Sequence, residues 1–184
     1  TGLAILDIAQ VLGGSLQFER AINQSLAMIG EKVNLRSISI FEFQGQSDAR
    51  LTFHWSDPYS TCDETQLQEL FGLNRESRVI TEFMEGQIGL RLEAVESIKK
   101  HSLEYYDVLA RNGVLNVLSV PLINRGEIIG YMIAENLQEE QDLDAVRLIE
   151  AVSYFLAQKI VSAELMTQLE EMSILDQLTN VQNR

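Results

Sequence analysis

The side chains that could do chemistry in this chain are few. Its 184 residues contain only two histidines, His54 and His101, and one cysteine, Cys62. A catalytic site needs a nucleophile, a base and a group that stabilises the transition state, all close together. The chain also has no H-E-x-x-H or C-x-x-C pattern of the kind that ligates a metal. We therefore predict no catalytic residues and no metal site, and we expect both histidines and the thiol to be ordinary surface or core groups.

The charge balance and the cysteine count limit the partners and the compartment. The chain has 27 acidic and 14 basic residues, which gives a net charge of −13. This excess argues against binding nucleic acid or an anionic membrane, both of which attract Lys and Arg. No run of eighteen apolar residues is present, so no membrane-spanning segment is expected. A single cysteine cannot form an internal disulfide and fits a reducing cytoplasm, where we expect the chain to reside.

The elements that would position these groups mix helices and strands. Apolar residues at helical spacing predict helices over residues 1–12, 15–33, 61–71, 77–85 and 102–112, with Ser15 as a cap. Alternating apolar residues predict strands over residues 35–43, 51–55, 88–93, 115–123 and 127–135, with Pro121 marking a bulge. This order predicts an α+β fold. One central antiparallel sheet would carry the N- and C-terminal helices on one face, and short helices and loops on the other.

The longest predicted element is a helix that begins at Asp142, because neither Gly nor Pro occurs after Leu143. From Asp142 to Leu175 it would be roughly 50 Å long, whereas a domain of this size is about 30–35 Å across. The helix is therefore expected to cover the domain with its first half and to leave it with its second. A second copy of the chain could bury the apolar stripe. The stripe consists of Val152, Leu156, Ile160, Ala163, Leu165, Leu169 and Met172.

A ligand site is expected on the sheet face beneath the segments between residues 57 and 112, away from the long helices. Aromatic walls with one or two charged groups fit a small polar or anionic ligand, and a guanidinium suits a carboxylate or phosphate. The alternative is that Tyr105 and Tyr106 cover the core and that Arg91 pairs with Glu93 or solvent. The candidate lining residues are Phe53, Trp55, Phe71, Arg91, Glu93, Tyr105, Tyr106, Leu109 and Ser119.

One local pattern consists of Gly113-Val114, then Leu118-Ser119-Val120-Pro121-Leu122, then Gly126 and Ile129-Gly130. This pattern resembles the strand pair of GAF domains. With the element order, the resemblance implies a GAF-like sensory domain over residues 15–160, preceded by an N-terminal helix or upstream linker over residues 1–14. Bilin-binding members carry His after the attachment cysteine, whereas Asp63 follows Cys62 here. The signature of the cyclic-nucleotide-binding members is also missing, so no cofactor is expected and the small-molecule ligand stays unknown.

The last nine residues read Asp-Gln-Leu-Thr-Asn-Val-Gln-Asn-Arg. They resemble the start of a GGDEF domain, the diguanylate cyclase domain, whose motif reads D-x-L-T-G-L-x-N-R. The matching residues are Asp176, Leu178, Thr179, Asn183 and Arg184, while Asn180 and Val181 replace Gly and Leu. The resemblance implies a signalling-helix linker over residues 161–175 and the start of a truncated GGDEF-like domain over residues 176–184. The catalytic Gly-Gly-Asp/Glu-Glu-Phe signature is missing, so this chain is not expected to be an enzyme itself.

Together the two resemblances imply a regulatory sensory and dimerisation module. It would form a homodimer through its N- and C-terminal helices and control, in cis, a C-terminal diguanylate cyclase that makes cyclic di-GMP from GTP. Two alternatives stay open at this point. The chain could be a small-molecule receptor whose dimerisation is incidental, or a degenerate GAF domain that acts only as a dimerisation scaffold.

Overall fold

The computed structural model describes residues 2–45, 48–60, 62–78, 80–81, 91–138 and 142–183. Its helices are α1 (Gly2–Gly13), α2 (Phe18–Val33), α3 (Glu64–Phe71), α5 (Val95–Ile98), α6 (Leu103–Arg111) and α7 (Asp142–Gln182). Its strands are β1 (Ser37–Glu42), β2 (Arg50–Ser56), β3 (Arg91–Ala94), β4 (Asn116–Asn124) and β5 (Glu127–Glu135). Most of the predicted helix over residues 77–85, and the start of the predicted strand over residues 88–93, lie outside the described residues.

The five strands form one antiparallel sheet in the order β2-β1-β5-β4-β3. Strands β4 and β5 are joined by Arg125 and Gly126, which both have positive φ angles, as in a tight hairpin turn. Pro121 pairs with Tyr131, and the register shifts just after it, between Leu122 and Ile123. The irregularity predicted at Pro121 is therefore present, one residue further along the strand.

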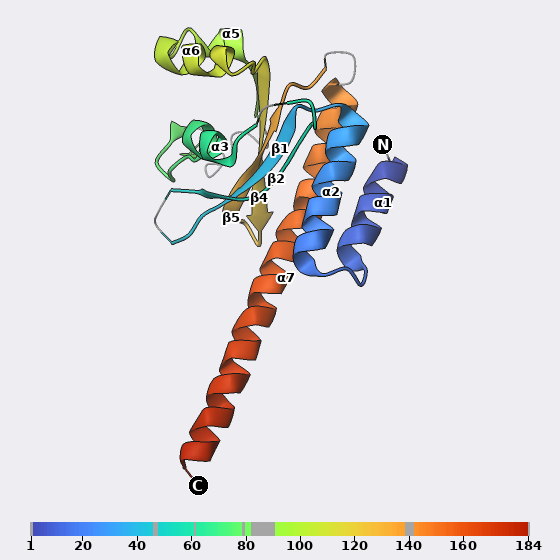
Figure 1. The fold of residues 1–184 in the computed structure, drawn as a ribbon, viewed down its shortest axis with the longest axis vertical. Helices are drawn as coiled ribbons and strands as arrows, with labels where there is room; N and C mark the ends of the chain where they lie inside the picture. The colour runs from blue at the N-terminus through green and yellow to red at the C-terminus, as the bar shows by residue number, and fades with distance from the viewer. Residues whose placement is uncertain are drawn as a thin grey trace.

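Helices cover both faces of the sheet, which confirms the predicted α+β layout. Figure 1 shows α1, α2 and α7 on one side of the strands and α3, α5 and α6 on the other. The helix-side core joins α1, α2 and α7 to strand residues such as Ile38, Ile40 and Val120. The opposite core joins α3, α5 and α6 to Phe41 and Tyr131. Successive strand residues serve opposite cores because their side chains alternate between the two faces.

The start of α2 differs from the prediction. The helix begins at Phe18, its N-cap is Gln17, and no side chain caps it by a hydrogen bond. Ser15 therefore does not act as the cap. Leu16 and Phe18 pack against the helix-side core. This packing, and not a capping side chain, fixes the start of the helix.

Helix α7 is continuous over 41 residues, or roughly 60 Å, and it leaves the domain. Its last buried residue is Ile160, and from Glu164 onward its side chains are exposed. Figure 1 shows the second half projecting away from the sheet and helices. The prediction of a helix that outruns the domain is confirmed, and the helix continues beyond Leu175 without a break.

The stripe predicted for contact with a second copy is only partly free. Val152 and Leu156 are fully buried and Ile160 is 5% exposed, all within the helix-side core of the same chain. These three residues therefore cannot contact a partner, and that part of the prediction is wrong. Leu165, Leu169 and Met172 are exposed, whereas Ala163 is half-buried. No helix in the described part of the chain combines the length and hydrophobicity needed to cross a bilayer.

Candidate functional site

Four buried polar side chains lie on the sheet face beneath α3 and α6. Ser37 and Ser39 come from β1, Ser119 from β4 and Glu135 from β5, and each is at most 8% exposed. Ser37 pairs with Glu135, while Ser39 and Ser119 both pair with Ile133. Because alternate residues of a strand point to one face, the strand pairing gathers these groups on a surface that is otherwise apolar. We call this set the polar cluster.

Glu135 is the one ionisable carboxyl group of the polar cluster, and only 1% of the residue is exposed. Its Oε2 atom lies 3.8 Å from Arg36 Nε and accepts a long hydrogen bond of 3.9 Å from the thiol of Cys62. Burial raises the pKa of Glu135, against the opposing effects of Arg36, Ser37 and Cys62. Burial likewise raises the pKa of Cys62, and the charge of Glu135 adds to it. The thiol is therefore poorly suited to act as a nucleophile.

Arg36 connects the polar cluster to the helices above it. Its Nη1 atom donates to the backbone carbonyl of Asn112, the residue that follows α6. The side chain of Gln66 in α3 donates to Asn112 Oδ1. One guanidinium thus lies between the buried carboxylate and the two helices that cover it.

Two hydroxyls of the polar cluster lack hydrogen-bond partners. Ser37 Oγ and Ser39 Oγ are fully buried, and neither meets hydrogen-bond geometry with another group in the described residues. The Ser37 hydroxyl is still close enough to Glu135 and Cys62 to lower their pKa values. Ser39 is the clearer case, and an unpaired buried hydroxyl costs about 1–3 kcal/mol. A polar molecule bound beneath α3 and α6 would supply the missing partner.

Six of the predicted ligand-site residues lie on this face of the sheet or in the helices and loops above it. They are Phe71, Glu93, Tyr105, Tyr106, Leu109 and Ser119. Tyr105 donates to the carbonyl of Leu70 at 3.0 Å, and burial raises its pKa to about 12, with Glu93 and Glu135 adding to the effect. Tyr106 donates to Glu96 Oε1 at 3.0 Å. Both tyrosines thus help to close the covering layer, and a hollow of about 340 Å³ beside Tyr105 separates α3 from α6.

Phe53 and Trp55 lie on the other face, so the expectation for these two residues is wrong. Phe53 contacts Phe18 of α2 at 5.7 Å between ring centroids, and the Trp55 ring packs directly over Gly30. The predicted residues therefore do not form one wall. Glu93 lies half-buried on β3, opposite Val117, and the side chain of Arg91 lies outside the described residues.

The polar cluster was not predicted from the sequence, although the sequence contains a pattern that indicates part of it. The run Ser37-Ile38-Ser39-Ile40 alternates small polar and apolar residues, which places both hydroxyls on one face of a strand. Glu135 ends an apolar strand, where a carboxylate is usually solvated. Arg36, one residue before β1, carried no signal. No group of three or more potential metal ligands exists among the described residues.

Replacing Glu135 with Gln is expected to flatten the pH dependence of stability. The pKa of Glu135 is raised in the folded state. At pH values between the usual pKa of a glutamate and this raised pKa, folding is therefore accompanied by the uptake of a proton by Glu135. The contribution of Glu135 to stability is thus fully present below its unfolded pKa and is lost as pH rises through the folded pKa. The free energy of unfolding in urea, measured from mildly acidic to neutral pH, should fall more for the wild type than for Glu135→Gln. Parallel curves for the two proteins would contradict the assignment.

Comparisons with known proteins agree with this architecture. Residues 17–160 match the family model of the GAF domain. The phycoerythrobilin-bound GAF domain of a cyanobacterial phytochrome has a TM-score of 0.68 and 13% identity, and the match covers 90% of this chain and 97% of that one. The GAF domain of an Acinetobacter phosphoenolpyruvate-protein phosphotransferase gives 0.61 and 16%, covering 88% and 93%. The A. aeolicus nlh2 GAF domain in an inactive state gives 0.61 and 13%, covering 87% and 94%. None of the curated proteins matches the sequence.

Proposed function

Because the chain belongs to the GAF domain family, we propose that it is the sensory part of a signalling protein. A small molecule bound at the polar cluster would change how α7 presents an output domain that follows it. The observation that carries this proposal is the division of α7. Its first half contributes to the domain core, with Ile160 as the last buried residue, while every described side chain from Glu164 onward is exposed.

The connection from β5 to α7 supports a route from the polar cluster to the helix. Glu135 is the last residue of β5, and α7 begins at Asp142. Asn136, the residue after Glu135, has a positive φ of 62°. Its side chain donates to Gly113 O and accepts from Leu115 N. A ligand that moves Glu135 therefore acts on a short segment that is tied to the start of β4 and leads directly into α7.

The proposed ligand is a small polar molecule. The phytochrome neighbours hold bilins, but in this chain Asp63 follows Cys62 where the bilin-binding pattern has His. Arg36 and Glu135 balance each other in charge, and the Ser39 hydroxyl of the same cluster is unpaired. A molecule with both hydrogen-bond donors and acceptors would satisfy these groups without leaving a buried charge uncompensated.

We expect Ser39→Ala to separate ligand binding from stability. Removing an unpaired buried hydroxyl should leave the ligand-free protein unchanged or stabilise it by up to about 1–3 kcal/mol. The same change should abolish the thermal shift that a polar metabolite from a broad panel produces in the wild type. Ser25→Ala is the matched control, since Ser25 is equally buried but donates to Ala21 O at 2.8 Å on the other face. A panel without any hit, or a shift that survives in Ser39→Ala, would leave the sensory proposal unsupported.

The exposed half of α7 is proposed to pair with the same helix of a second copy. In heptad spacing, Leu165 and Met172 occupy one core position, and Leu169 occupies the other. Each of these three is at least 54% exposed. The neighbouring flanking positions, 166, 168, 173 and 175, are uncharged, and Glu164, Glu170 and Glu171 face away. A second copy can therefore approach this seam without charge repulsion. Most of the stability of a helix comes from packing of its apolar face, so the pairing would also stabilise this half of α7.

We further propose that the output domain is a diguanylate cyclase that begins near Asp176. The similarity of residues 176–184 to a GGDEF start supports this, and so does the apolar seam, which ends where Asp176 would occupy a core position. Two GTP molecules held on two subunits must face each other to be joined, so the pairing of α7 would set the rate. Cyclic di-GMP formed from GTP by the intact protein is the readout that tests this proposal.

A further inference from the structure

A groove runs along the outer edge of β2, an edge strand of the sheet. It has a volume of about 1050 Å³ and is bordered by β2, the end of β1, the start of α2, Glu64 at the start of α3, and the part of α7 where the helix leaves the domain. Four consecutive β2 residues, 51 to 54, line it. Side chains of both faces are thus involved, so the groove follows the edge of the strand. No other strand of the described sheet pairs with that edge.

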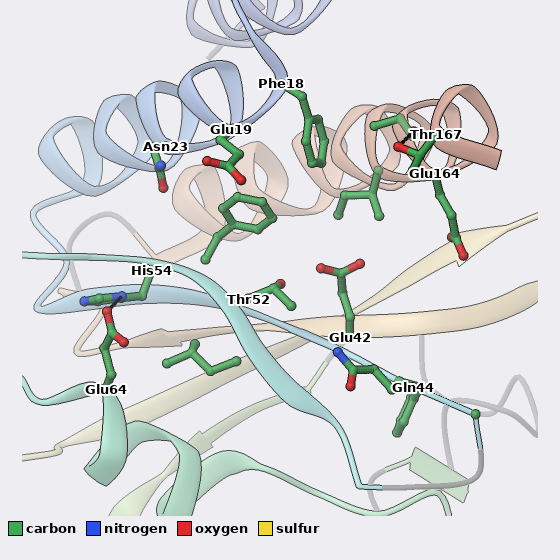
Figure 2. Close-up of a pocket in the computed structure, with 16 residues that line it drawn as sticks. Phe18, Glu19, Asn23, Glu42, Gln44, Thr52, His54, Glu64, Glu164 and Thr167 are labelled. Carbon is green, nitrogen blue, oxygen red and sulfur yellow. Dashed lines mark hydrogen bonds and ion pairs between the residues drawn. The ribbon is translucent and has the colours of Figure 1, made fainter. Parts of the chain in front are cut away.

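The groove combines an apolar floor with an acidic rim. Phe18, Phe53 and Ile160 contribute to the floor. Figure 2 shows the carboxylates of Glu19 and Glu42, from α2 and β1, directed into the hollow. A third carboxylate, from α7, belongs to Glu164. These three have no ion-pair or hydrogen-bond partner within the described residues, and the described lining contains neither Lys nor Arg.

We propose that this groove binds an extended basic segment of a partner protein, which pairs with the outer edge of β2 as an additional strand. An unpaired strand edge offers backbone donors and acceptors, and peptides bind such edges by strand addition. Lys or Arg side chains would meet the unpaired carboxylates, and apolar side chains would lie on the phenylalanine floor. At one end, Gln68 Oε1 already accepts from Leu51 N at 2.8 Å, so the pairing would begin beyond Leu51. The proposal does not depend on the ligand at the polar cluster.

Occupation of the groove would act on α7 without disturbing its pairing seam. Ala163, Glu164 and Thr167 form the helical wall of the groove. Leu165 and Leu169 project from a different side of the helix, because residues three to four apart share a face and these belong to another row. A bound segment would therefore hold α7 against β2 at the point where the helix leaves the domain, in a monomer or a dimer.

A fluorescently labelled peptide that alternates Lys and Val is the probe for this site. Fluorescence anisotropy should show binding to the wild type. The double variant Glu42→Gln/Glu164→Gln should weaken it about tenfold, since two charge contacts are lost. The matched control is Glu31→Gln/Glu171→Gln, which removes the same charge from exposed positions outside the groove and should change the affinity less than about twofold. No binding to the wild type, or equal effects of the two double variants, would overturn the proposal.

A second measurement separates strand addition from attraction by charge alone. The same peptide, N-methylated at every second backbone nitrogen in either phase, keeps its charge but loses donors along one edge. In the phase that faces β2 it should no longer bind. Hydrogen exchange should slow at residues 52–55 of β2 when the unmodified peptide is present, and not in the other outer strand, β3. Unchanged binding of both methylated peptides, or no protection in β2, would show attraction by charge only and would refute the pairing.

Discussion

Replacing Leu165 and Leu169 together with Glu is expected to convert the proposed dimer of this chain into a monomer. Each leucine is more than half exposed in the single chain, and in a pair of helices each would be buried at a core position. Truncating a central interface residue commonly costs about 2 kcal/mol or more, and symmetry doubles the number of lost contacts. Four buried carboxylates would add repulsion. The dissociation constant should rise on the order of a thousandfold or more, as measured by analytical ultracentrifugation.

A control on the same helix makes this result specific. Ile174 and Leu178 are similarly exposed, but the heptad spacing places them away from the seam. Ile174→Glu/Leu178→Glu should therefore leave the dimer intact. If the proposed cyclase follows α7, the intact protein with the seam variant should also form less cyclic di-GMP than the control. A wild-type chain that sediments as a monomer at high micromolar concentration, or equal behaviour of the two variants, would exclude pairing through this seam.

Local sequence patterns were sufficient to predict most of the described elements and their layers, but not the short helix α5. The helix from Asp142 was predictable because neither Gly nor Pro interrupts it and its apolar residues keep a helical period. The hairpin at Arg125-Gly126 followed from turn chemistry, and β5 begins and ends at the predicted residues. In these places a few neighbouring residues determine the local structure, and the tertiary fold agrees with their preference.

The face on which a side chain lies could not be predicted where long-range pairing determines it. Leu51, Phe53 and Trp55 alternate and would share one face of a regular strand. The register shift between Ile40 and Phe41 inserts an extra residue in β2, so Phe41 pairs with Leu51 while Ile40 pairs with Phe53. The bulge thereby places Leu51 with the core beneath α3, and Phe53 and Trp55 with the helix-side core.

The same limit applies to the stripe on α7. Val152 and Leu156 face the core of their own chain, whereas Leu165 and Leu169, to which the stripe drifts on another side of the helix, face solvent. Periodicity reports that a face is apolar, and it does not report what covers that face. The polar cluster illustrates the point again, because the residues that surround Glu135 come from β1, β5 and the segment before α3, far apart in the sequence.

The largest effect on stability is expected from Arg36→Met, which leaves the buried Glu135 without its cationic partner. Removing one member of a buried ion pair typically costs about 3–5 kcal/mol, because the other charge stays desolvated. Without Arg36, the pKa of Glu135 should be raised further, since Arg36 is the largest of the effects that lower it. The loss should therefore be greatest at neutral pH and shrink as pH falls and Glu135 takes up a proton. Urea unfolding at several pH values measures it.

Two further variants separate the buried charge from the other contacts of Arg36. Arg36→Met/Glu135→Gln should recover most of the stability at neutral pH, with only the loss of the hydrogen bond to Asn112 O, about 1 kcal/mol, remaining at every pH. Arg20→Met removes an exposed arginine from α2 and should change stability by less than about 0.5 kcal/mol. If Arg36→Met were as mild as Arg20→Met, Glu135 would not be held as a buried charge. The ligand site proposed around it would then lose its electrostatic basis.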